Sequence, residues 1–594
     1  MKIDIAVFSG TRPAVASHLL ALEQAQVADN CRLDSGEIRP LRRMLPETRL
    51  ATRNVEDVYR HDGQWLIFHE PVSVCRSLLA GDPLGRLYFT GQTSGPRMLR
   101  SPGSRGGVPL SVRLGLPAPE VAPQVRAMGQ GDETEVYCTY YLFTLVSELG
   151  EESAPSPPSA LLDVQDGQSV EVSGLAVPDC TDRNPVTHKR IYRANTGSTD
   201  TVEQFVAEIP VNQDRFTDEK SGSELGAALA TEGWLEPPAG LQGLTAVAGG
   251  SLAGFVENQL YFSEPFAPYA WPRAYSHSLE HCIAAQAATG GHLAVLTDAA
   301  AYLVACDDVR ATSPRKLEGY APCVGPRGVV ETSRGVLFPG VDGLYLVNGG
   351  SVAAENVTRG VLSEEAWREL RPETFRAWPL GDQYLCFHED ARGVRRGFVF
   401  DLAAPQTLRG LWMHARAGYL EPEGRRLHLA RESGGRTSVE LWEGDAVRYS
   451  AQWKSRKYCF PSPVNMAAAQ VDAEYPPVLG RAEYEAQRAE LAAGYADELG
   501  RGELGGSPGG GLCGGVLFAG DLLDTVGAPY GEQPVLWFQY FVDGREVYAR
   551  NVTRPGPFAL PPASGREVEV CLSGAVPVRR ITLASGMAEL RRSG

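Results

Sequence analysis

The sequence contains little lysine, and acidic residues outnumber basic ones. Only six of the 56 basic residues are lysines, and with 72 acidic residues the formal net charge is −16. A protein that coats nucleic acid needs clustered cations that release the counterions of the phosphates. The composition therefore excludes a general nucleic-acid coat.

Long apolar runs and paired cysteines are also missing from the sequence. No run approaches the roughly 18 apolar residues of a membrane span, and the N-terminal segment lacks the apolar stretch of a signal peptide. We therefore expect a chain without a membrane span that is made in the cytosol. The 11 cysteines form no C-x-x-C pair, which favours buried reduced thiols over a disulfide framework or a zinc ribbon.

Motifs for catalysis are missing or lie in the wrong context. His277, Glu280 and His281 match the string H-x-x-E-H, which binds zinc only from one face of a long helix. Strand-like sequence surrounds this string, so we interpret it as a surface loop with two ordinary histidines. The glycine-rich residues 505–515 lack the Lys-Ser/Thr ending of a phosphate-binding loop. We predict no catalytic, cofactor-binding or metal-binding residues, and no enzyme.

Three aspartates are the candidates for a pair of catalytic carboxylates. Asp298, Asp342 and Asp382 each lie in a turn-like sequence, where aspartate commonly caps backbone N–H groups. A propeller glycoside hydrolase would use such carboxylates across a cleft, and it stays the least favoured alternative function.

Short apolar runs separated by turns dominate what the sequence does contain. Glycine (65 residues) and proline (42 residues) are abundant and show no triplet period, which favours many tight turns. Strand-like runs, among them residues 65–68, 72–75 and 86–90, recur over residues 46–117 and 241–449 without a long helix between them. This rhythm predicts a mainly β protein with a β-propeller made of these two segments.

Residues 118–240 differ in character from the segments on either side. Residues 135–146 read as one long strand of aromatic and β-branched residues, and prolines mark the corners that follow. Several further strands predict an inserted β-sandwich of the fibronectin or immunoglobulin-like kind.

The two ends of the chain are predicted to form a β-rich platform domain from residues 1–45 and 450–594. Residues 17–28 have a short helical pattern, and residues 31–41 read as a hairpin that turns at Gly36. Residues 480–500 read as an amphipathic helix before a glycine-rich linker. Because a closed propeller brings its entry and exit strands together, we expect the two ends to pack against each other.

Several short segments together resemble the tail nozzle proteins (tail tubular protein B-like) of short-tailed bacteriophages. The opening GTRP and the later WKSRK are two of them. The segments span nearly the whole chain: 10–13, 19–20, 25–30, 33–41, 85–91, 262–265, 271–272, 296–298, 342–344, 453–457 and 558–561. Residues 145–155 also resemble part of an inserted fibronectin-like module.

The resemblance implies a structural virion protein that forms a homohexameric ring at the distal end of the genome channel. Its implied partners are the adaptor and portal side of the tail and the tail fibre or spike proteins. Viral DNA would pass through without specific binding, and assembly would occur in the cytoplasm of the host bacterium. We expect an acidic lumen, with candidate loops at residues 131–133, 151–152, 307–308 and 364–365.

A receptor-binding or adhesin component of the tail is the alternative function. It would present an exposed aromatic platform, for which Tyr137, Tyr140 and Tyr141 are the candidates, although alternate residues of a strand are also expected in a core. The basic residues Arg39, Arg42 and Arg43 and the basic run 453–457 are interpreted as solvated or subunit-facing patches.

Overall fold

The computed structural model of the chain describes all residues except 92, 101–109, 197–200, 434–435, 476–535 and 592–594. The chain divides into two compact units. The first contains residues 1–69, 324–346 and 355–594, and the second contains residues 70–323 and 347–354. The helix and the glycine-rich linker predicted within residues 480–515 lie outside the described residues.

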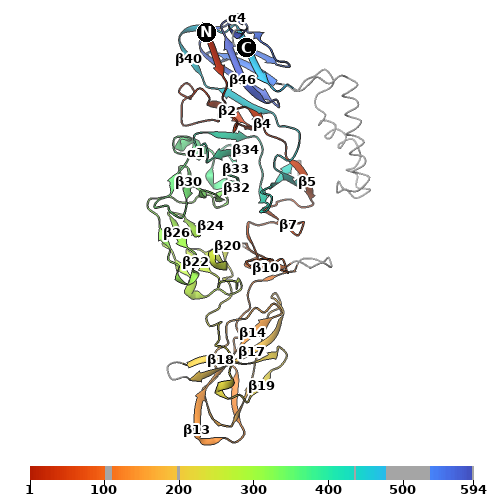
Figure 1. Ribbon diagram of the computed structural model, residues 1–594, viewed down its shortest axis with the longest axis vertical. Coiled ribbons are helices and arrows are strands. Elements are labelled where there is room, and N and C mark those ends of the chain that lie inside the picture. Colours follow the sequence, from red (N-terminus) through yellow and green to blue (C-terminus); the bar gives the residue numbers. More distant parts are fainter. Residues whose placement is uncertain (92, 101–109, 197–200, 434–435, 476–535, 592–594) are drawn as a thin grey trace, which may run out of the picture. The chain divides into compact units, whose positions relative to one another are not determined.

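The protein is mainly β, as the sequence predicts, and it contains many four-stranded antiparallel sheets (Figure 1). The described α-helices are short, and none is long and apolar enough to cross a membrane. They are α1 (Glu364–Glu369) and α4 (Met587–Arg591). Turns of 3-10 helix lie at Gly222–Glu224, Ala248–Gly250, Arg273–Tyr275, Val309–Ala311, Pro326–Gly328 and Pro372–Thr374.

The second unit contains three four-stranded sheets, each built from consecutive strands. Strands predicted at residues 72–75 and 86–90 are confirmed to within a residue as β8 and β9. The first sheet is β8 (Val72–Arg76), β9 (Leu87–Gly91), β10 (Arg97–Arg100) and β11 (Leu110–Arg113). The second is β20 (Gln242–Val247), β21 (Ser251–Val256), β22 (Gln259–Phe262) and β23 (His277–Ser278). The third is β24 (Ile283–Thr289), β25 (His292–Thr297), β26 (Ala301–Ala305) and β27 (Arg315–Lys316).

Residues 124–218 form smaller sheets around a core of their own. The long strand predicted over 135–146 is wrong, because the chain changes sheets at Tyr140: β13 pairs with β15, and β14 pairs with β17. The three sheets are β12 (Gln124–Met128), β16 (Ser169–Ser173) and β19 (Arg215–Asp218); β13 (Asp132–Thr139) and β15 (Leu162–Asp166); and β14 (Tyr141–Ser147), β17 (Val186–Thr196) and β18 (Thr201–Pro210).

In the first unit, strands from the start of the chain complete sheets formed much later in the sequence. One four-stranded sheet contains β36 (Ala417–Leu420), β37 (Leu427–Ser433), β38 (Arg436–Leu441) and the early strand β5 (Leu45–Leu50). Another contains β28 (Val330–Thr332), β29 (Gly335–Pro339), β30 (Leu344–Val347) and β31 (Glu355–Asn356). The hairpin of β6 (Asp57–His61) and β7 (Gln64–Phe68) packs on β36.

The largest sheet of the first unit has ten strands. Strand β2 (Ala25–Asp29) joins its two parts, since it pairs with β35 on one side and with β39 on the other. The remaining strands are β32 (Arg376–Leu380), β33 (Gln383–Glu389), β34 (Arg395–Asp401), β35 (Leu408–Leu411), β39 (Ala451–Ser455), β40 (Tyr458–Asn465), β42 (Leu536–Val542), β43 (Arg545–Asn551) and β45 (Ser564–Gly574).

The N-terminal and C-terminal segments share one hydrophobic core. A four-stranded sheet places β1 (Lys2–Ile5) beside β46 (Val578–Ala584), followed by β41 (Ala468–Ala473) and β44 (Phe558–Ala559). Figure 1 shows both ends of the chain at this sheet, where the N-terminal ammonium bonds to Glu589 at 2.8 Å.

The hairpin predicted at residues 31–41 is confirmed as β3 (Cys31–Arg32) and β4 (Arg39–Pro40), and Gly36 takes the positive φ of 76° that the turn requires. The helical pattern over residues 17–28 is a wrong prediction: the chain makes turns and then enters β2. Leu19 and Leu22 stay exposed, while Ala25 and Ala28 are buried, so pairing of β2 with β39 prevails over local helix propensity.

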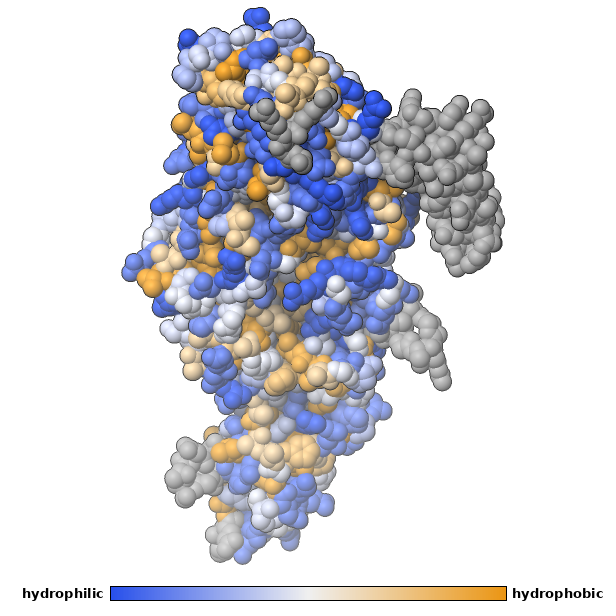
Figure 2. All heavy atoms as spheres, turned by 45° about the horizontal axis from the view of Figure 1, so that its top comes forward, coloured by the Kyte–Doolittle hydropathy of each residue, from blue (hydrophilic) through white to orange (hydrophobic). Residues whose placement is uncertain are grey.

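Hydrophilic and hydrophobic residues are interspersed over the face that Figure 2 shows. Such scattered hydrophobic residues are normal for a protein surface. The structure therefore offers no reason to seek a binding surface there on hydropathy alone.

Trp453 of β39 ties the chain start to the late strands. Its side chain is fully buried, its ring meets Phe8 edge to face at 4.9 Å, and its Nε1 donates to the Ser9 carbonyl at 3.1 Å. We predict that Trp453→Ala lowers the free energy of unfolding by about 3–5 kcal/mol, because it leaves a cavity and an unpaired carbonyl. Urea unfolding followed by circular dichroism measures this loss.

Trp537→Ala is the matched control, since the Trp537 side chain on β42 is 39% exposed. We expect it to cost less than half as much. Equal losses for the two variants would contradict the role assigned to Trp453.

Candidate functional site

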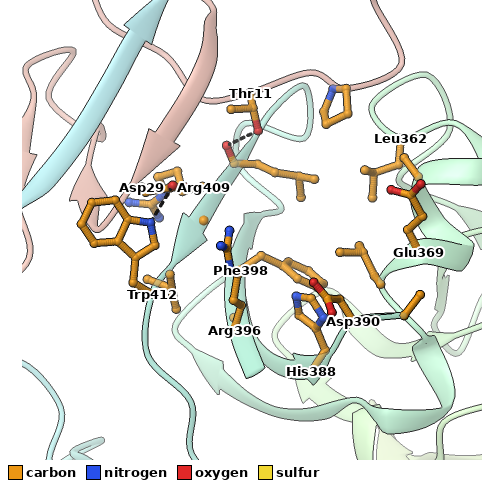
Figure 3. Close-up of a pocket in the computed structure, with 18 of the residues that line it drawn as sticks. Thr11, Asp29, Leu362, Glu369, His388, Asp390, Arg396, Phe398, Arg409 and Trp412 are labelled. Carbon is orange, nitrogen blue, oxygen red and sulfur yellow. Dashed lines mark hydrogen bonds between the residues drawn. The ribbon is translucent and has the colours of Figure 1, made fainter. Parts of the chain in front are cut away.

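A cavity of about 510 Å³ lies wholly within the first unit (Figure 3). Its volume is within the range of small-molecule sites. Its walls come from the chain start, from α1, from β33 to β35 and from β2, so segments about 400 residues apart meet there. We take this cavity as the candidate functional site and call it the Asp29 pocket.

The floor of the Asp29 pocket is apolar. Leu362 and Leu370 lie just before and just after α1, and Phe398 and Leu408 come from β34 and β35. The helix α1 is fixed at its start because the Ser363 side chain accepts a hydrogen bond from the backbone N–H of Ala366 at 3.2 Å. On the opposite wall, Thr11 Oγ1 donates to the Leu408 carbonyl at 3.2 Å (Figure 3).

Asp29 is a partly buried acidic group of the pocket. Trp412 Nε1 donates to Asp29 Oδ2 at 2.8 Å (Figure 3), and burial raises the pKa of the Asp29 carboxyl although this bond and Arg396 oppose the change. A Cβ at Gly410 would lie 2.0 Å from Asp29 Oδ1. Glycine is therefore required on β35 for β2 and its carboxylate to approach this closely.

His388 on β33 also lines the pocket and is 4% exposed. Burial lowers its pKa to about 4, so the ring is neutral at pH 7. Its ring centroid lies 5.9 Å from Phe398 and 6.0 Å from Phe375, and its Nδ1 has no hydrogen-bond partner among the described residues. These ring contacts make His388 part of the packed wall.

Arginines form the cationic part of the pocket wall. Arg409 is 3.4 Å from Asp34 and donates to the Cys31 carbonyl, so its charge is already paired. Arg392 and Arg396 are exposed, and neither side chain forms a hydrogen bond or an ion pair within the described part of the chain. An apolar floor beside two unpaired guanidiniums is suited to binding an anion with an apolar body.

The residues of the H-x-x-E-H string do not form a metal site. His277 lies on β23, where its Nε2 is 2.7 Å from Thr312 Oγ1, and Glu280 pairs with Lys316. The string is thus on a short strand and the residues after it, and not wholly in a loop as predicted. Within the described ranges, no group of three or more His, Cys, Asp or Glu could hold a metal ion.

The three candidate aspartates have local partners. Tyr345 Oη donates to Asp342 Oδ1 at 2.6 Å, and Ser333 Oγ donates to Asp382 Oδ1. The backbone N–H of Asp298 donates to the Cys282 carbonyl at 3.0 Å. The Asp342 and Asp382 carboxylates thus bind side-chain hydroxyls, and the Asp298 contact is made by its backbone.

The three tyrosines considered as a platform lie in different environments. Tyr137 is 42% exposed, whereas Tyr141 is fully buried and donates to Asp218 at 2.8 Å. Tyr140 Oη donates to Glu203 at 2.6 Å. The fully buried Tyr141 cannot belong to an exposed aromatic surface.

Acidic neighbours pair with several residues of the two basic patches. Arg39 bonds to Glu37 at 2.8 Å, Lys457 lies 3.0 Å from Glu567, and Lys454 lies 3.5 Å from Glu569. These patches therefore present less positive charge than their sequences suggest.

Glu151 and Glu152 do not qualify as exposed acidic loop residues. They are 4% and 9% exposed, and Glu152 accepts hydrogen bonds from Thr144 and Tyr192, both at 2.7 Å. Glu151 accepts from Asn184 at 2.7 Å. The expectation that residues 151–152 line a lumen is wrong, because both carboxylates are used inside the fold.

The sequence analysis missed the residues of the Asp29 pocket, since no motif links them. His388 carried a weak signal in the sequence. It follows Tyr384 and Cys386 at a spacing of two residues, so the three side chains lie on the same, buried face of β33.

The raised pKa of Asp29 leads to a prediction about pH. Because the pKa of Asp29 is higher in the folded state, ionisation of its carboxyl destabilises the fold. This loss of stability begins as pH rises above 3.8, the pKa of aspartate in the unfolded chain. We expect Asp29→Asn to unfold at higher urea concentration than the wild type at pH 7. The difference should vanish as pH falls towards 3.8.

Glu369→Gln is the control, because Glu369 lines the same pocket but is exposed. Its unfolding curve should follow that of the wild type at every pH. A destabilised Asp29→Asn variant at pH 7 would contradict the burial effect.

No protein-family model and no curated protein matches the sequence. The resemblance to tail nozzle proteins therefore stays a prediction.

The solved structures that the chain matches have low sequence identity to it. The Neurospora crassa Pan2 WD40 domain is 6% identical, with 64% of this chain and 91% of that chain covered and a TM-score of 0.27. The AfRom2 CNH domain is 11% identical, with 67% and 98% covered and a TM-score of 0.28. Saccharomyces cerevisiae Sqt1 is 9% identical, with 68% and 99% covered and a TM-score of 0.24.

Proposed function

We propose that this chain is a structural subunit of the tail nozzle of a short-tailed bacteriophage. Six copies would form a ring at the distal end of the genome channel, in contact with the adaptor and portal side of the tail and with its fibre or spike proteins. In this proposal the subunit is not an enzyme, belongs to the virion and is assembled in the cytoplasm of the host bacterium.

The observation that carries the proposal is the meeting of the resembling segments in space. Segment 25–30 contains β2 and segment 453–457 contains most of β39, and these strands pair with each other. Four of the segments, 25–30, 33–41, 453–457 and 558–561, contribute buried side chains to the same hydrophobic core: Ala25, Ala28, Ile38, Trp453, Phe558 and Leu560. Segments that are far apart in the sequence but resemble one family thus share one core, as parts of a single functional module would.

We further propose that the four-stranded sheets are blades of one β-propeller. Within the second unit, β20 packs on β8 and on β24. Within the first unit, β28 packs on β32, and β32 packs on β36. Contact between the first strands of successive sheets is the arrangement of propeller blades, and β5 completes the sheet of β36 to β38 as a closing strand.

Residues 118–240 are proposed as a sandwich inserted into this propeller. Their main core is distinct from the core beneath β8 to β11. Two ion pairs join them to that sheet: Arg97 with Asp182 at 2.9 Å and Arg100 with Glu148 at 2.7 Å. Leu149 also packs against the core of that sheet, so the module is joined by polar and apolar contacts while keeping a core of its own.

The acidic composition suits a channel through which DNA slides. Six copies would carry about −96 charges, and negative walls repel phosphates, so the genome would meet little friction. Asp307, Asp308, Glu364 and Glu365 stay candidates for such walls, although Asp308 also caps the turn at Arg310 with a bond of 3.0 Å.

Native mass spectrometry and electron microscopy test the proposed assembly. We expect a ring with a mass close to six times the 64.1 kDa of the chain. A net acidic lining of its lumen would support sliding of DNA, and a net basic lining would contradict it. A monomer under all conditions, with binding to host cells or cleavage of a glycan, would instead favour the adhesin or the hydrolase.

Deleting residues 120–239 and joining the ends by a short linker tests the inserted module. Because the two cores are largely separate, we expect a soluble product that still forms the ring and loses only the module's own melting transition. Circular dichroism and native mass measure both properties. An insoluble product would count against the insertion.

A further inference from the structure

A second cavity of the first unit, about 330 Å³ in volume, is lined mainly by arginine side chains. We propose that this cavity binds a small multivalent oxyanion of the phosphate class, such as pyrophosphate. The proposal goes beyond the nozzle function and does not depend on it. We call this cavity the arginine cavity; its five arginines are Arg327, Arg371, Arg376, Arg395 and Arg416.

The fold brings three of these arginines to equivalent positions. Arg327 lies in the turn before β28, Arg376 begins β32, and Arg416 immediately precedes β36. Each is thus at the start of the first strand of a sheet, and these first strands pack on one another in succession. The repeated geometry of the sheets therefore gathers guanidinium groups that are far apart in the sequence.

These three arginines share two carboxylates. Arg327 binds Asp57 through two bonds of 2.7 Å each, while Arg376 binds Glu56 at 2.7 Å and Arg416 binds the other oxygen of Glu56. The side chains of Glu56 and Asp57 are only 13% and 16% exposed. One positive charge is left without an acidic partner in a partly desolvated place, where an anion gains more than it would in water.

The titration of the cluster agrees with an excess of positive charge. Burial opposes ionisation of Glu56, yet the bonds from Arg376 and Arg416 lower its pKa. Burial, followed by the charge of Arg327, lowers the pKa of Arg376. Repulsion between guanidinium groups is relieved when an oxyanion enters.

The other two arginines offer donors to a ligand. Arg371 bonds to Glu373 through Nε at 3.0 Å, and Arg395 bonds to Glu389 through Nε at 3.3 Å. Arg371 Nη1 also lies 3.9 Å from a Glu389 oxygen, an ion pair longer than a hydrogen bond. Within the described ranges the Nη groups of both arginines form no hydrogen bond, so a guanidinium fork can still bind two oxygens of a phosphate.

The remaining polar groups of the cavity set its selectivity. Glu373 and Glu389 also line it, and they pair with Arg371 and Arg395, so a ligand must compete with these exposed ion pairs, which are weak in water. His414 lines it as well, and burial, together with Arg395 and Arg376, lowers its pKa to about 4. The ring is neutral at pH 7 and adds a hydrogen-bonding group without adding charge.

Isothermal titration of the full chain with pyrophosphate at constant ionic strength tests the proposal. We expect saturable binding of one pyrophosphate per chain and a concentration-dependent rise in melting temperature. Orthophosphate should bind more weakly than pyrophosphate does. Titration with citrate at the same charge distinguishes a phosphate site, which prefers pyrophosphate, from a general site for polyanions, which binds both alike.

The double variant Arg371→Gln/Arg395→Gln should weaken pyrophosphate binding at least tenfold. Both side chains are well exposed, at 40% and 54%, so the fold should tolerate the change. Arg425→Gln/Arg436→Gln is the matched control, because both arginines are exposed and line neither cavity, and it should bind as the wild type does. Arg371→Gln alone serves if the double variant does not fold.

Three results would overturn the proposal. The first is that 10 mM pyrophosphate produces neither heat nor a shift in melting temperature. The second is that the Arg371 and Arg395 variants bind pyrophosphate as tightly as the wild type does, and the third is that the control variant loses as much affinity as they do. The ring mass of the protein is measured separately, so failure here leaves the nozzle assignment unaffected.

Discussion

The pairing of early strands with late ones is the constraint on which the first unit depends. Strand β2 fills the gap between β35 and β39, and β5 completes the sheet that β36 to β38 begin. Without them, strand edges would be left with unpaired N–H and C=O groups. The entropy of closing loops of about 400 residues must be offset by this pairing and by the shared core that contains Trp453.

Charged side chains reinforce the closure at the starts of the strands. Glu56 and Asp57 lie where the early chain enters β6, and they bind arginines that come from three later sheets. If the arginine of such an ion pair were removed, the carboxylate would remain partly buried without a compensating charge, and the fold would be destabilised. The ion pairs that hold the sheets together also form the arginine cavity. The same set of residues therefore contributes to stability and to the proposed anion site.

The net charge of the chain has more than one use in the structure. Glu151 and Glu152 satisfy buried donors among residues 124–218, and Glu567 and Glu569 neutralise Lys457 and Lys454. These acidic residues are therefore structural, and in the proposed nozzle the charge available to a channel is smaller than the total suggests.

The sequence alone determined the local features, because these depend on neighbouring residues. Alternating apolar residues and turn glycines predicted the mainly β character, the strands near residues 65 to 90 and the hairpin at Gly36. The resemblance of short segments supplied the functional hypothesis. None of these depends on knowing which distant segment pairs with which.

Tertiary structure decided the features that need partners far along the chain. Residues 25–28 form a strand and not a helix because β39 offers a pairing edge, and the long strand predicted over 135–146 divides at Tyr140 because two different sheets receive its halves. The Asp29 pocket and the arginine cavity exist only after β2 and residues 56–57 have met late strands. Pairing energy and burial between such segments are absent from any local window of sequence, and they override the weak local preferences.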